Sequence, residues 1–528
     1  MSNNYTLNSI YHIAKADFLQ RIRSNNFLIA IGVCIFLIYS FVPEIGASYS
    51  ILTLGNYRGL YNSAWIGGMV ANCIPFFALI GFYVVNYAVQ RDYDTGVGQI
   101  IATTRITRIQ YLFGKLSSNF AVLFFMLLVI AVMTVVMFYV RGETTKLELD
   151  KLLIPLMVLG IPAMFIVSAI AVFMDSITSL GRGAINVLYF FLFVAFVGGS
   201  IVNPYLDVFS VSTAMADISK SLAVIHPDWN GNSGSGLIIR ELPAQISVFE
   251  WEGMHWDLSI IGPRLFFMGS SAILVLLAAL GFNRFDTTKI RKQKTRKTKF
   301  FGKKDSAIET NYIPSGIKLK DAVLPKSRFS FFPLLKAELK MMLKGNTDLW
   351  KLFTVVFFIL SAFTPLSFAY IVALPLLWFF QTLLLSKLGS REITNRCDEY
   401  IFSFPHPLLR QLPATLTAST LYMSIVALPV IIRLVILGDF YGVVAVLVGA
   451  LFIPVTAITF GIVTKGSKLF EVLFAMTIYA SFNGIPFLDL IGSIEASREL
   501  GMAYYFFGSS LGLIVLAFIM RKRHLKSM

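Results

Sequence analysis

Long apolar stretches alternate with short polar segments along most of the chain, and this alternation predicts a polytopic membrane protein. Twelve stretches approach the length of about 20 residues that an α-helix needs to cross a bilayer. They lie at 27–42, 64–89, 116–140, 152–174, 184–202, 260–282, 350–364, 367–386, 413–437, 441–464, 469–490 and 502–520. Because Thr364-Pro365 is the only break within 350–386, those two stretches could also form one re-entrant hairpin.

A basic, amphipathic segment precedes the first and the seventh apolar stretch. Residues 15–26 read KADFLQRIRSNN, and residues 336–346 read KAELKMMLKGN. Apolar residues recur there every three or four positions, which predicts helices lying in the inner membrane interface. The two apolar stripes consist of Ile10, Ala14, Phe18 and Ile22, and of Phe332, Leu335, Leu339 and Met342.

A longer polar segment follows the second stretch of each half. The first polar segment (91–115) begins RDYDTGVGQIIATTRITRIQ, and the second (387–412) contains REITNRCDEYIFSFPHPLLRQ from Arg391. The amphipathic segments lie 321 residues apart and the polar segments 300 to 301, a difference explained by the loop near 44–63, which the second half lacks. The sequence therefore predicts two tandem six-helix units that run in the same direction, as in many transporters.

Composition supports this reading, and the basic residues give an orientation. Apolar residues make up 56% of the chain and charged residues 14%, whereas a soluble domain has about 25% charged residues. With both termini inside, 36 of the 45 Lys and Arg residues fall on inner segments and 9 on outer ones. This bias predicts a cell-membrane protein with cytoplasmic termini. It also explains the net charge of +16 without nucleic acid as a partner.

The domain boundaries follow from the same pattern. We expect a first permease-like unit at 1–283, a basic cytoplasmic linker at 284–330 and a second unit at 331–528. The linker could touch anionic lipid headgroups or act only as a solvated connection. The one large outer loop is 203–258, which contains Trp251 and Trp256 at positions suited to the outer interface.

Motifs of common active sites are absent from the sequence. It contains no GxxxxGK[ST], HExxH, CxxC or GxSxG pattern, so we expect no catalytic residue, metal site or cofactor in this chain. Two histidines of the outer loop each precede an aspartate by two residues, but loop composition explains that spacing better than a metal site does. Charged residues lie at the ends of the apolar stretches, which suits an apolar or amphipathic cargo better than a small ion.

The two polar segments are the strongest functional candidates. Each begins with a basic–acidic pair, Arg91-Asp92 or Arg391-Glu392, and ends near a basic residue and a glutamine. A plain loop would need only a few polar residues, whereas these segments retain apolar positions such as Ile100. That composition is typical of a short surface helix that docks into a groove of a partner.

The first polar segment resembles the inner-loop motif of ABC-2 type permeases, the membrane subunits of type V ATP-binding-cassette exporters. In that family an acidic residue and Thr-Gly precede a short coupling helix with a T-x-P-x-x-R-x-Q-like pattern. The residues that match are Asp94, Thr95, Gly96, Thr104, Arg108 and Gln110, with Arg105 where many members have proline. The second segment keeps Pro405, Arg410 and Gln411 but lacks Thr-Gly. Its acidic residue is Glu392, in the basic–acidic pair that opens the segment.

This resemblance covers most of the chain by topology and some fifty residues by motif. It implies an all-α, fused double permease with interfacial helices and cytoplasmic coupling helices. Its partners would be separate ABC-type ATPase subunits that bind ATP and Mg²⁺, membrane lipid and a transported cargo such as a peptide, lipid-like molecule or drug. The alternatives are a secondary transporter with parallel repeats and, less favoured, a membrane enzyme or sensor.

The orientation can be tested by cysteine labelling after Cys34, Cys73 and Cys397 are replaced. We expect Ser306→Cys in the linker to react with an impermeant thiol reagent only after the cells are permeabilised. Ser233→Cys in the outer loop should react in intact cells and serves as the control. Labelling of Ser306→Cys from outside intact cells would contradict the predicted topology.

Overall fold

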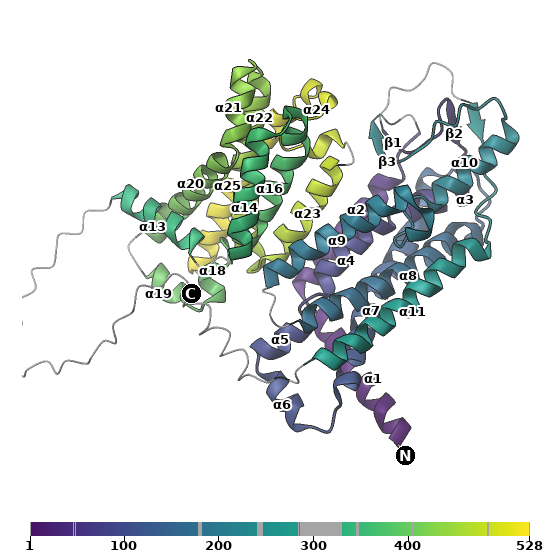
Figure 1. Ribbon diagram of the computed structural model, residues 1–528, viewed down its shortest axis with the longest axis horizontal. Helices are drawn as coiled ribbons and strands as arrows, with labels where there is room; N and C mark the ends of the chain where they lie inside the picture. The colour runs from purple at the N-terminus through teal and green to yellow at the C-terminus, as the bar shows by residue number, and fades with distance from the viewer. Residues whose placement is uncertain are drawn as a thin grey trace, which may run out of the picture.

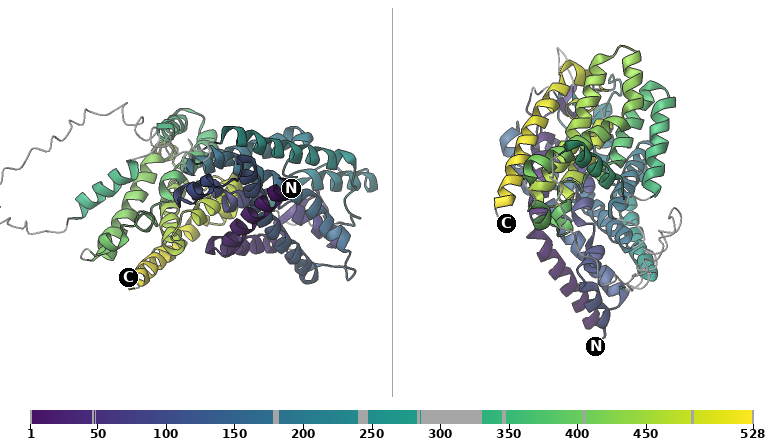
Figure 2. Two further views of the ribbon diagram at one scale, coloured as in Figure 1. Left: turned by 90° about the horizontal axis from the view of Figure 1, so that it is seen from below. Right: turned by 90° about the vertical axis from the view of Figure 1, so that its left-hand side faces the viewer.

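A computed structural model describes residues 2–526, apart from 46, 48, 178–181, 240–246, 283–284, 286–329, 345–347, 404–405 and 483–484. The predicted linker at 284–330 therefore lies almost wholly outside the described residues. The described chain is largely α-helical, and its two halves lie side by side (Figures 1 and 2).

The described residues of the first half form eleven α-helices and four short strands. The helices are α1 (Ser2–Ile22), α2 (Asn25–Phe41), α3 (Ser63–Ala71), α4 (Ile74–Val85), α5 (Ala88–Asp94), α6 (Val97–Thr103), α7 (Arg108–Arg141), α8 (Leu149–Ser176), α9 (Arg182–Val202), α10 (Thr213–Ile225) and α11 (Leu258–Gly281). The strands are β1 (Tyr49–Thr53), β2 (Tyr57–Gly59), β3 (Gly234–Ile239) and β4 (Ser247–Phe249).

The second half is built from helices alone in the residues that the structure describes. They are α13 (Phe331–Leu343), α14 (Asp348–Phe363), α15 (Leu366–Phe368), α16 (Leu374–Phe380), α17 (Thr382–Leu385), α18 (Arg391–Thr394), α19 (Asp398–Phe402), α20 (Pro407–Val426), α21 (Leu428–Ile436), α22 (Phe440–Thr464), α23 (Lys468–Phe482), α24 (Glu495–Glu499) and α25 (Met502–Lys526). A π-helical turn at Ala369–Ala373 joins α15 to α16.

Six helical segments among the described residues are long and apolar enough to cross a membrane, and the number rises to nine if each bent pair is one span. The six are α7, α8, α11, α15 to α17, α22 and α25. This supports a polytopic membrane protein, whereas twelve spans remain a prediction. α9 and α14 contain shorter apolar segments, Ile185–Ser200 and Trp350–Phe363.

Prolines explain two of the three breaks between bent helices; the α1/α2 bend of 71° contains none. The α3/α4 bend of 46° lies just before Pro75, and the α20/α21 bend of 60° lies just before Pro429. Proline has no N–H to donate to the preceding turn and its ring crowds the backbone there. Pro365 separates α14 from α15 in the same way, so the region expected as two stretches or one hairpin forms two packed helical arms.

Helices pack in the same order in the two halves. In the first half α1 lies on α7, α7 on α8, and α8 on α11, while in the second half α13 lies on α20, α20 on α22, and α22 on α25. The predicted amphipathic segments are thus the helices α1 and α13. Gly114 allows the close approach of α1 to α7, because a Cβ there would lie 2.8 Å from Ile13 Cγ2.

The halves meet through reciprocal contacts. α4 of the first half packs on α23 of the second, and α9 of the first half packs on α17 of the second. Aromatic rings also meet between the halves: Phe76 of α4 and Tyr479 of α23 have centroids 5.0 Å apart, and Phe190 of α9 and Phe379 of α16 have centroids 4.0 Å apart. Asn186 Nδ2 donates to Glu471 Oε2 over 2.6 Å in the same interface.

The same turn follows α9 and α23. Each helix is followed by a short 3₁₀ turn, Pro204–Leu206 or Pro486–Leu488, and then by a buried aspartate, Asp207 or Asp489. Each aspartate accepts backbone N–H groups of the residues that come next: Asp207 from Val211 at 2.7 Å, and Asp489 from Ile494 at 2.8 Å. The third residue after each aspartate has a positive φ, 59° at Ser210 and 67° at Gly492.

The predicted outer loop and the loop near 44–63 form one cap, which the sequence did not predict. β1 pairs with β3 in antiparallel orientation, and β2 pairs with β4 in parallel orientation, so the two loops are joined by backbone hydrogen bonds. The expectation of Trp251 at the membrane interface was wrong. Its side chain is only 1% exposed, packs against Gly68 and donates from Nε1 to Asp217 at 3.2 Å.

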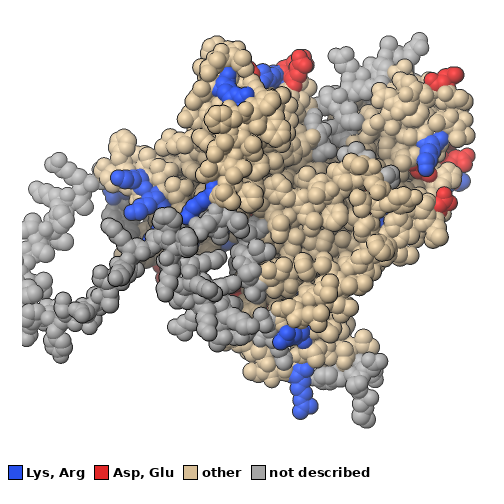
Figure 3. Space-filling view, in the orientation of Figure 1, with Lys and Arg blue, Asp and Glu red and all other residues tan. Residues whose placement is uncertain are grey.

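Charge is distributed as a membrane protein requires. On the face shown in Figure 3, Lys, Arg, Asp and Glu lie toward the two ends, with a broad band of other residues between them. The strands and α10 lie at one end, and α1, α5 and α6 lie at the other (Figure 1). An uncharged band matches the hydrocarbon core, where an ionised side chain costs several kcal/mol.

We expect Glu143 to fasten the cap to the end of α7 in a pH-dependent way. Its carboxylate accepts from Arg58 Nη1 at 2.7 Å and Nη2 at 2.8 Å, and from the Tyr61 backbone N–H at 2.9 Å. These bonds to Arg58, opposed by partial burial, lower the pKa of Glu143 below its ordinary value of 4.5. A lowered pKa stabilises the folded state at pH values above the ordinary pKa. This stabilisation is lost as the pH falls through the lowered pKa of Glu143.

Glu143→Gln should therefore speed hydrogen exchange across 57–62. The loss in free energy of local opening should be about 1 kcal/mol and constant from about pH 8 to about pH 5.5. The difference from the unmodified protein should shrink at more acidic pH. Glu148→Gln, which removes an acid that pairs with Lys146 and Lys151, is the control. A difference that does not change in acid would contradict an ionised Glu143 in this role.

Candidate functional site

The first polar segment forms two short helices, α5 and α6, and then enters α7. Gly96 separates α5 from α6 with φ 76°, a left-handed conformation that glycine adopts without a steric penalty. α7 begins with a capping box: Thr107 Oγ1 accepts from the Gln110 backbone N–H at 3.2 Å, and Gln110 Oε1 accepts from the Thr107 N–H at 2.8 Å. The segment is thus a folded unit with defined helix ends.

A buried carboxylate holds α5 to the helix that precedes the first span. Asp17 of α1 is 4% exposed and pairs with Arg91 of α5, with Arg21 at 3.0 Å and with Lys115 of α7 at 3.1 Å. The Ser118 hydroxyl also donates to it at 3.1 Å. Burial raises the pKa of Asp17, but Arg21, Lys115 and Arg91 together lower it by more, so its net pKa lies below the ordinary value.

The basic partners of Asp17 are themselves held by further contacts. Lys115 Nζ lies 2.8 Å from Asp92 Oδ2, and the Tyr111 hydroxyl donates to Asp92 at 2.7 Å. Arg21 Nη1 donates to Asn119 Oδ1 at 2.7 Å and to a backbone carbonyl of α4 at 3.0 Å. The network therefore links α1, α4, α5 and α7 into one unit at the predicted inner end.

Aromatic packing positions α6 next to this network. Tyr93 and Tyr111 contact Phe282 and Phe285, which follow α11, with ring centroids 4.7 to 6.5 Å apart. Gly98 of α6 lies against the Phe285 ring without room for a Cβ. Any larger residue at Gly98 would push α6 away from the end of α11.

The second polar segment is also held by a buried acid–arginine pair. We call this pair the anchor of its half. Glu338 of α13 is 1% exposed and accepts from Arg391 Nη2 at 3.0 and 3.2 Å. Glu392, also buried, accepts from Gln411 Nε2 at 2.9 Å and lies 3.5 Å from Arg521 Nη2 of α25. Burial raises the pKa of Glu338 above its ordinary value, because one arginine offsets desolvation less than the three cations around Asp17 do.

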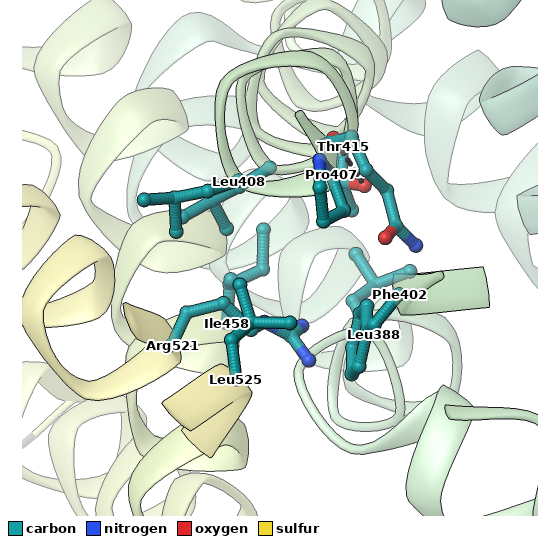
Figure 4. Close-up of a pocket in the computed structure, with 10 residues that line it drawn as sticks. Leu388, Phe402, Pro407, Leu408, Thr415, Ile458, Arg521 and Leu525 are labelled. Atoms are coloured by element: carbon teal, nitrogen blue, oxygen red, sulfur yellow. Dashed lines mark hydrogen bonds between the residues drawn. The ribbon is translucent and has the colours of Figure 1, made fainter. Parts of the chain in front are cut away.

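The end of α25 closes the second segment. Arg521 and Leu525 face Phe402 and Leu388 across a pocket of about 10 Å³, and the Arg521 guanidinium lies 4.9 Å from the Phe402 ring centroid (Figure 4). That volume holds about one water molecule. This pocket is a packing defect in the anchor and is too small for a substrate.

The residues predicted as an ATPase-coupling set fall into two groups. Exposed at the surface are Asp94, Thr95, Arg105 and Arg108, with Gly96, Arg410 and Gln411 partly exposed. Gln110 and Glu392 are buried, and their contacts cap α7 and hold the second anchor. Pro405 lies outside the described residues. The structure gathers the first-segment residues around α6, and coupling remains a prediction for all of them.

Apolar side chains are exposed on the same short helices. Val97 and Ile100 of α6 are 43% and 68% exposed, and Tyr400 of α19 is 72% exposed. They lie near the charged end of the molecule, away from the uncharged band. Single exposed apolar residues are common on protein surfaces, so docking of a partner here stays a prediction.

The anchoring residues were missed by the sequence analysis, which gave no role to the acids of the amphipathic segments. Asp17 and Glu338 are separated by 321 residues, the same spacing that related the two segments. That recurrence of an acid was the signal that could have identified them.

A comparison of the chain with protein-family models, with curated proteins and with solved structures finds no match.

Asp17→Asn should destabilise the protein and detach α5 from α1. Removing one partner of a buried ion network leaves Arg21, Lys115 and Arg91 undercompensated, at a cost of about 3–5 kcal/mol. The apparent melting temperature of the purified protein should fall. Glu44→Gln is the control, since Glu44 is 73% exposed and its pair with Arg141 contributes about 0–1 kcal/mol. Equal melting temperatures for the two variants would contradict the assigned role of Asp17.

Proposed function

We propose that this chain is the membrane subunit of an ATP-driven ABC transporter, with two six-helix units fused in one polypeptide. It would lie in the cell membrane with both termini in the cytoplasm and export an apolar or amphipathic cargo. The chain itself makes no covalent bond, and its partner ATPases would bind ATP and Mg²⁺.

The observation that carries the proposal is the repeated anchoring of the two polar segments. In each half a buried acid on the helix before the first span pairs with the arginine that opens the polar segment, Asp17 with Arg91 and Glu338 with Arg391. A short helix of the segment is then left at the surface with exposed apolar and charged side chains. An anchored surface helix can transmit the motion of a docked partner to the spans, whereas a loose loop cannot.

The paired organisation of the chain supports two related units. The same packing order of helices occurs in both halves, and the same turn follows α9 and α23. The contact of α4 with α23 is matched by that of α9 with α17. Reciprocal contacts of this kind are those of a two-fold interface between like subunits. Two like units would seat two ATPases, and closure of the ATPases on nucleotide would move the units relative to each other.

ATP can drive transport only if the cargo binds the two conformations of the permease with different affinity. The scarcity of charge within the apolar stretches favours an apolar or amphipathic cargo, such as a peptide, a lipid-like molecule or a drug. A secondary transporter with parallel repeats would instead depend on an ion gradient and would need no partner ATPase.

The test is affinity purification of the tagged, full-length chain from its native membranes in a mild detergent. We expect an ATPase with a P-loop motif to co-purify and to hydrolyse ATP. Arg105→Glu with Arg108→Glu should lower ATPase recovery about tenfold or more, because losing charge-assisted contacts costs about 1.5–3 kcal/mol.

Lys336→Glu reverses an exposed charge on α13 and is the matched control, which should leave recovery unchanged. Unchanged recovery with the double variant would contradict docking at α6. Absence of any ATPase, together with transport that depends on an ion gradient, would favour the secondary transporter.

A further inference from the structure

A cavity of about 310 Å³ lies between the two halves. Its walls come from α1, the turn to α2, α2 itself, the end of α4, α5 and the start of α23. The volume falls within the range of about 300–1,000 Å³ that small-molecule sites occupy. Residues up to about 450 positions apart line it, so it exists only when the halves are packed together.

One end of the cavity is cationic. Arg21, Arg91 and Lys468 line it, and none of its lining residues is acidic. Asp17 pairs with both arginines from behind the wall, while Lys468 Nζ lies over the Tyr87 ring, 5.3 Å from its centroid. An anion in the cavity would therefore meet three cations and no carboxylate of the lining.

One polar atom of a buried lining residue, Oδ1 of Asn86, has no hydrogen-bond partner among the described residues. The Asn86 side chain is 3% exposed. Leaving such an acceptor unpaired in a buried site costs free energy, which a hydrogen-bond donor of a ligand would recover.

The other end of the cavity is apolar. Phe27, Ala30 and Val33 line it from α2, with Val84 from α4 and Val472 from α23. Because a helix rises 1.5 Å per residue, Val33 lies about 13 Å along the axis from Ser24 at the cationic end. The cavity thus has the shape and polarity of a headgroup site that continues into an acyl site.

Two of the three cations, Arg21 and Arg91, come from the first half, and Lys468 comes from the second. The residue that corresponds to Arg21 in the second half, 321 positions later, is Met342. The acid–arginine anchor occurs in both halves, whereas this additional arginine does not. Arg21 pairs with Asp17 and donates to Asn119 in the first half, and its side chain also lines the cavity.

We propose that the cavity binds an anionic amphiphile, with a carboxylate or phosphate headgroup on Arg21, Arg91 and Lys468 and an apolar chain between α2, α4 and α23. The site is formed by this chain alone and needs no ATPase, so its test is independent of the proposed transport function.

Photolabelling of the purified, full-length protein in a neutral detergent tests the proposal. The probes are diazirine-bearing palmitic acid, a diazirine-bearing phosphatidic acid and the uncharged alcohol with the same diazirine chain. Mass spectrometry should place the labels of one or both acidic probes on the lining residues of α2, α4 and α23. The alcohol should label those residues about tenfold less, since it lacks the charge-assisted contacts.

Matched variants make the result decisive. Lys468→Gln should reduce acidic labelling about fivefold or more, whereas Lys465→Gln, which removes a neighbouring exposed cation, should not. Ala30→Phe fills the apolar end and should abolish labelling, whereas Leu28→Phe, at a position 60% exposed, should not. Melting temperatures establish that each variant is folded. If Ala30→Phe does not fold, Lys468→Gln still tests the site.

Labelling by only one acidic probe would support the proposal and identify the headgroup. Inorganic phosphate that competes as strongly as the unlabelled amphiphile would assign the site to a free anion and overturn the proposed apolar half. Labelling that is unchanged in Lys468→Gln, or that spreads over the exposed faces of α7, α11 and α25, would overturn the site.

Discussion

A buried acid–arginine pair in front of the first span of each half is the interaction on which the polar end of this protein depends. Asp17 and Glu338 would be costly to bury alone, and each is compensated by the arginine that opens the polar segment of its half. The pairs join helices that are distant in sequence. Because they are buried, they hold α5 and α18 firmly while α6 and α19 stay at the surface, which is the arrangement a docking site needs.

The two anchors differ in a way that matters for the proposals. Asp17 meets three cations, and the resulting network extends through Lys115 and Asp92 into α7. Glu338 meets one arginine, and the second acid, Glu392, is tied instead to α20 and α25. The first half therefore carries the extra positive charge, and that charge lines the cavity between the halves. The second half uses its polar residues to close its own end.

The interface between the halves combines aromatic packing with a hydrogen bond between Asn186 and Glu471. Rings from α4, α9, α16 and α23 fill the apolar part, and Asn186 with Glu471 supplies a hydrogen bond near the polar end. In a bilayer, apolar contacts between helices gain little from exclusion of water, so close packing and such hydrogen bonds must hold them together. The cavity beside this contact shows that packing is incomplete there, where a bound molecule could complete it.

The sequence by itself determined the helical, membrane-type architecture and most helix positions, because hydropathy and proline act locally along the chain. It also located the two polar segments and the helices before the first and seventh stretches. It could not separate exposed from buried polar residues: Gln110 and Glu392 were expected at a partner surface, yet they serve a helix cap and an anchor. Only the tertiary structure paired Asp17 with Arg91, joined the two loops of the outer cap and formed the cavity. Each of these depends on residues far apart in the chain, and their proximity is set by the packing of whole helices, which no local pattern records.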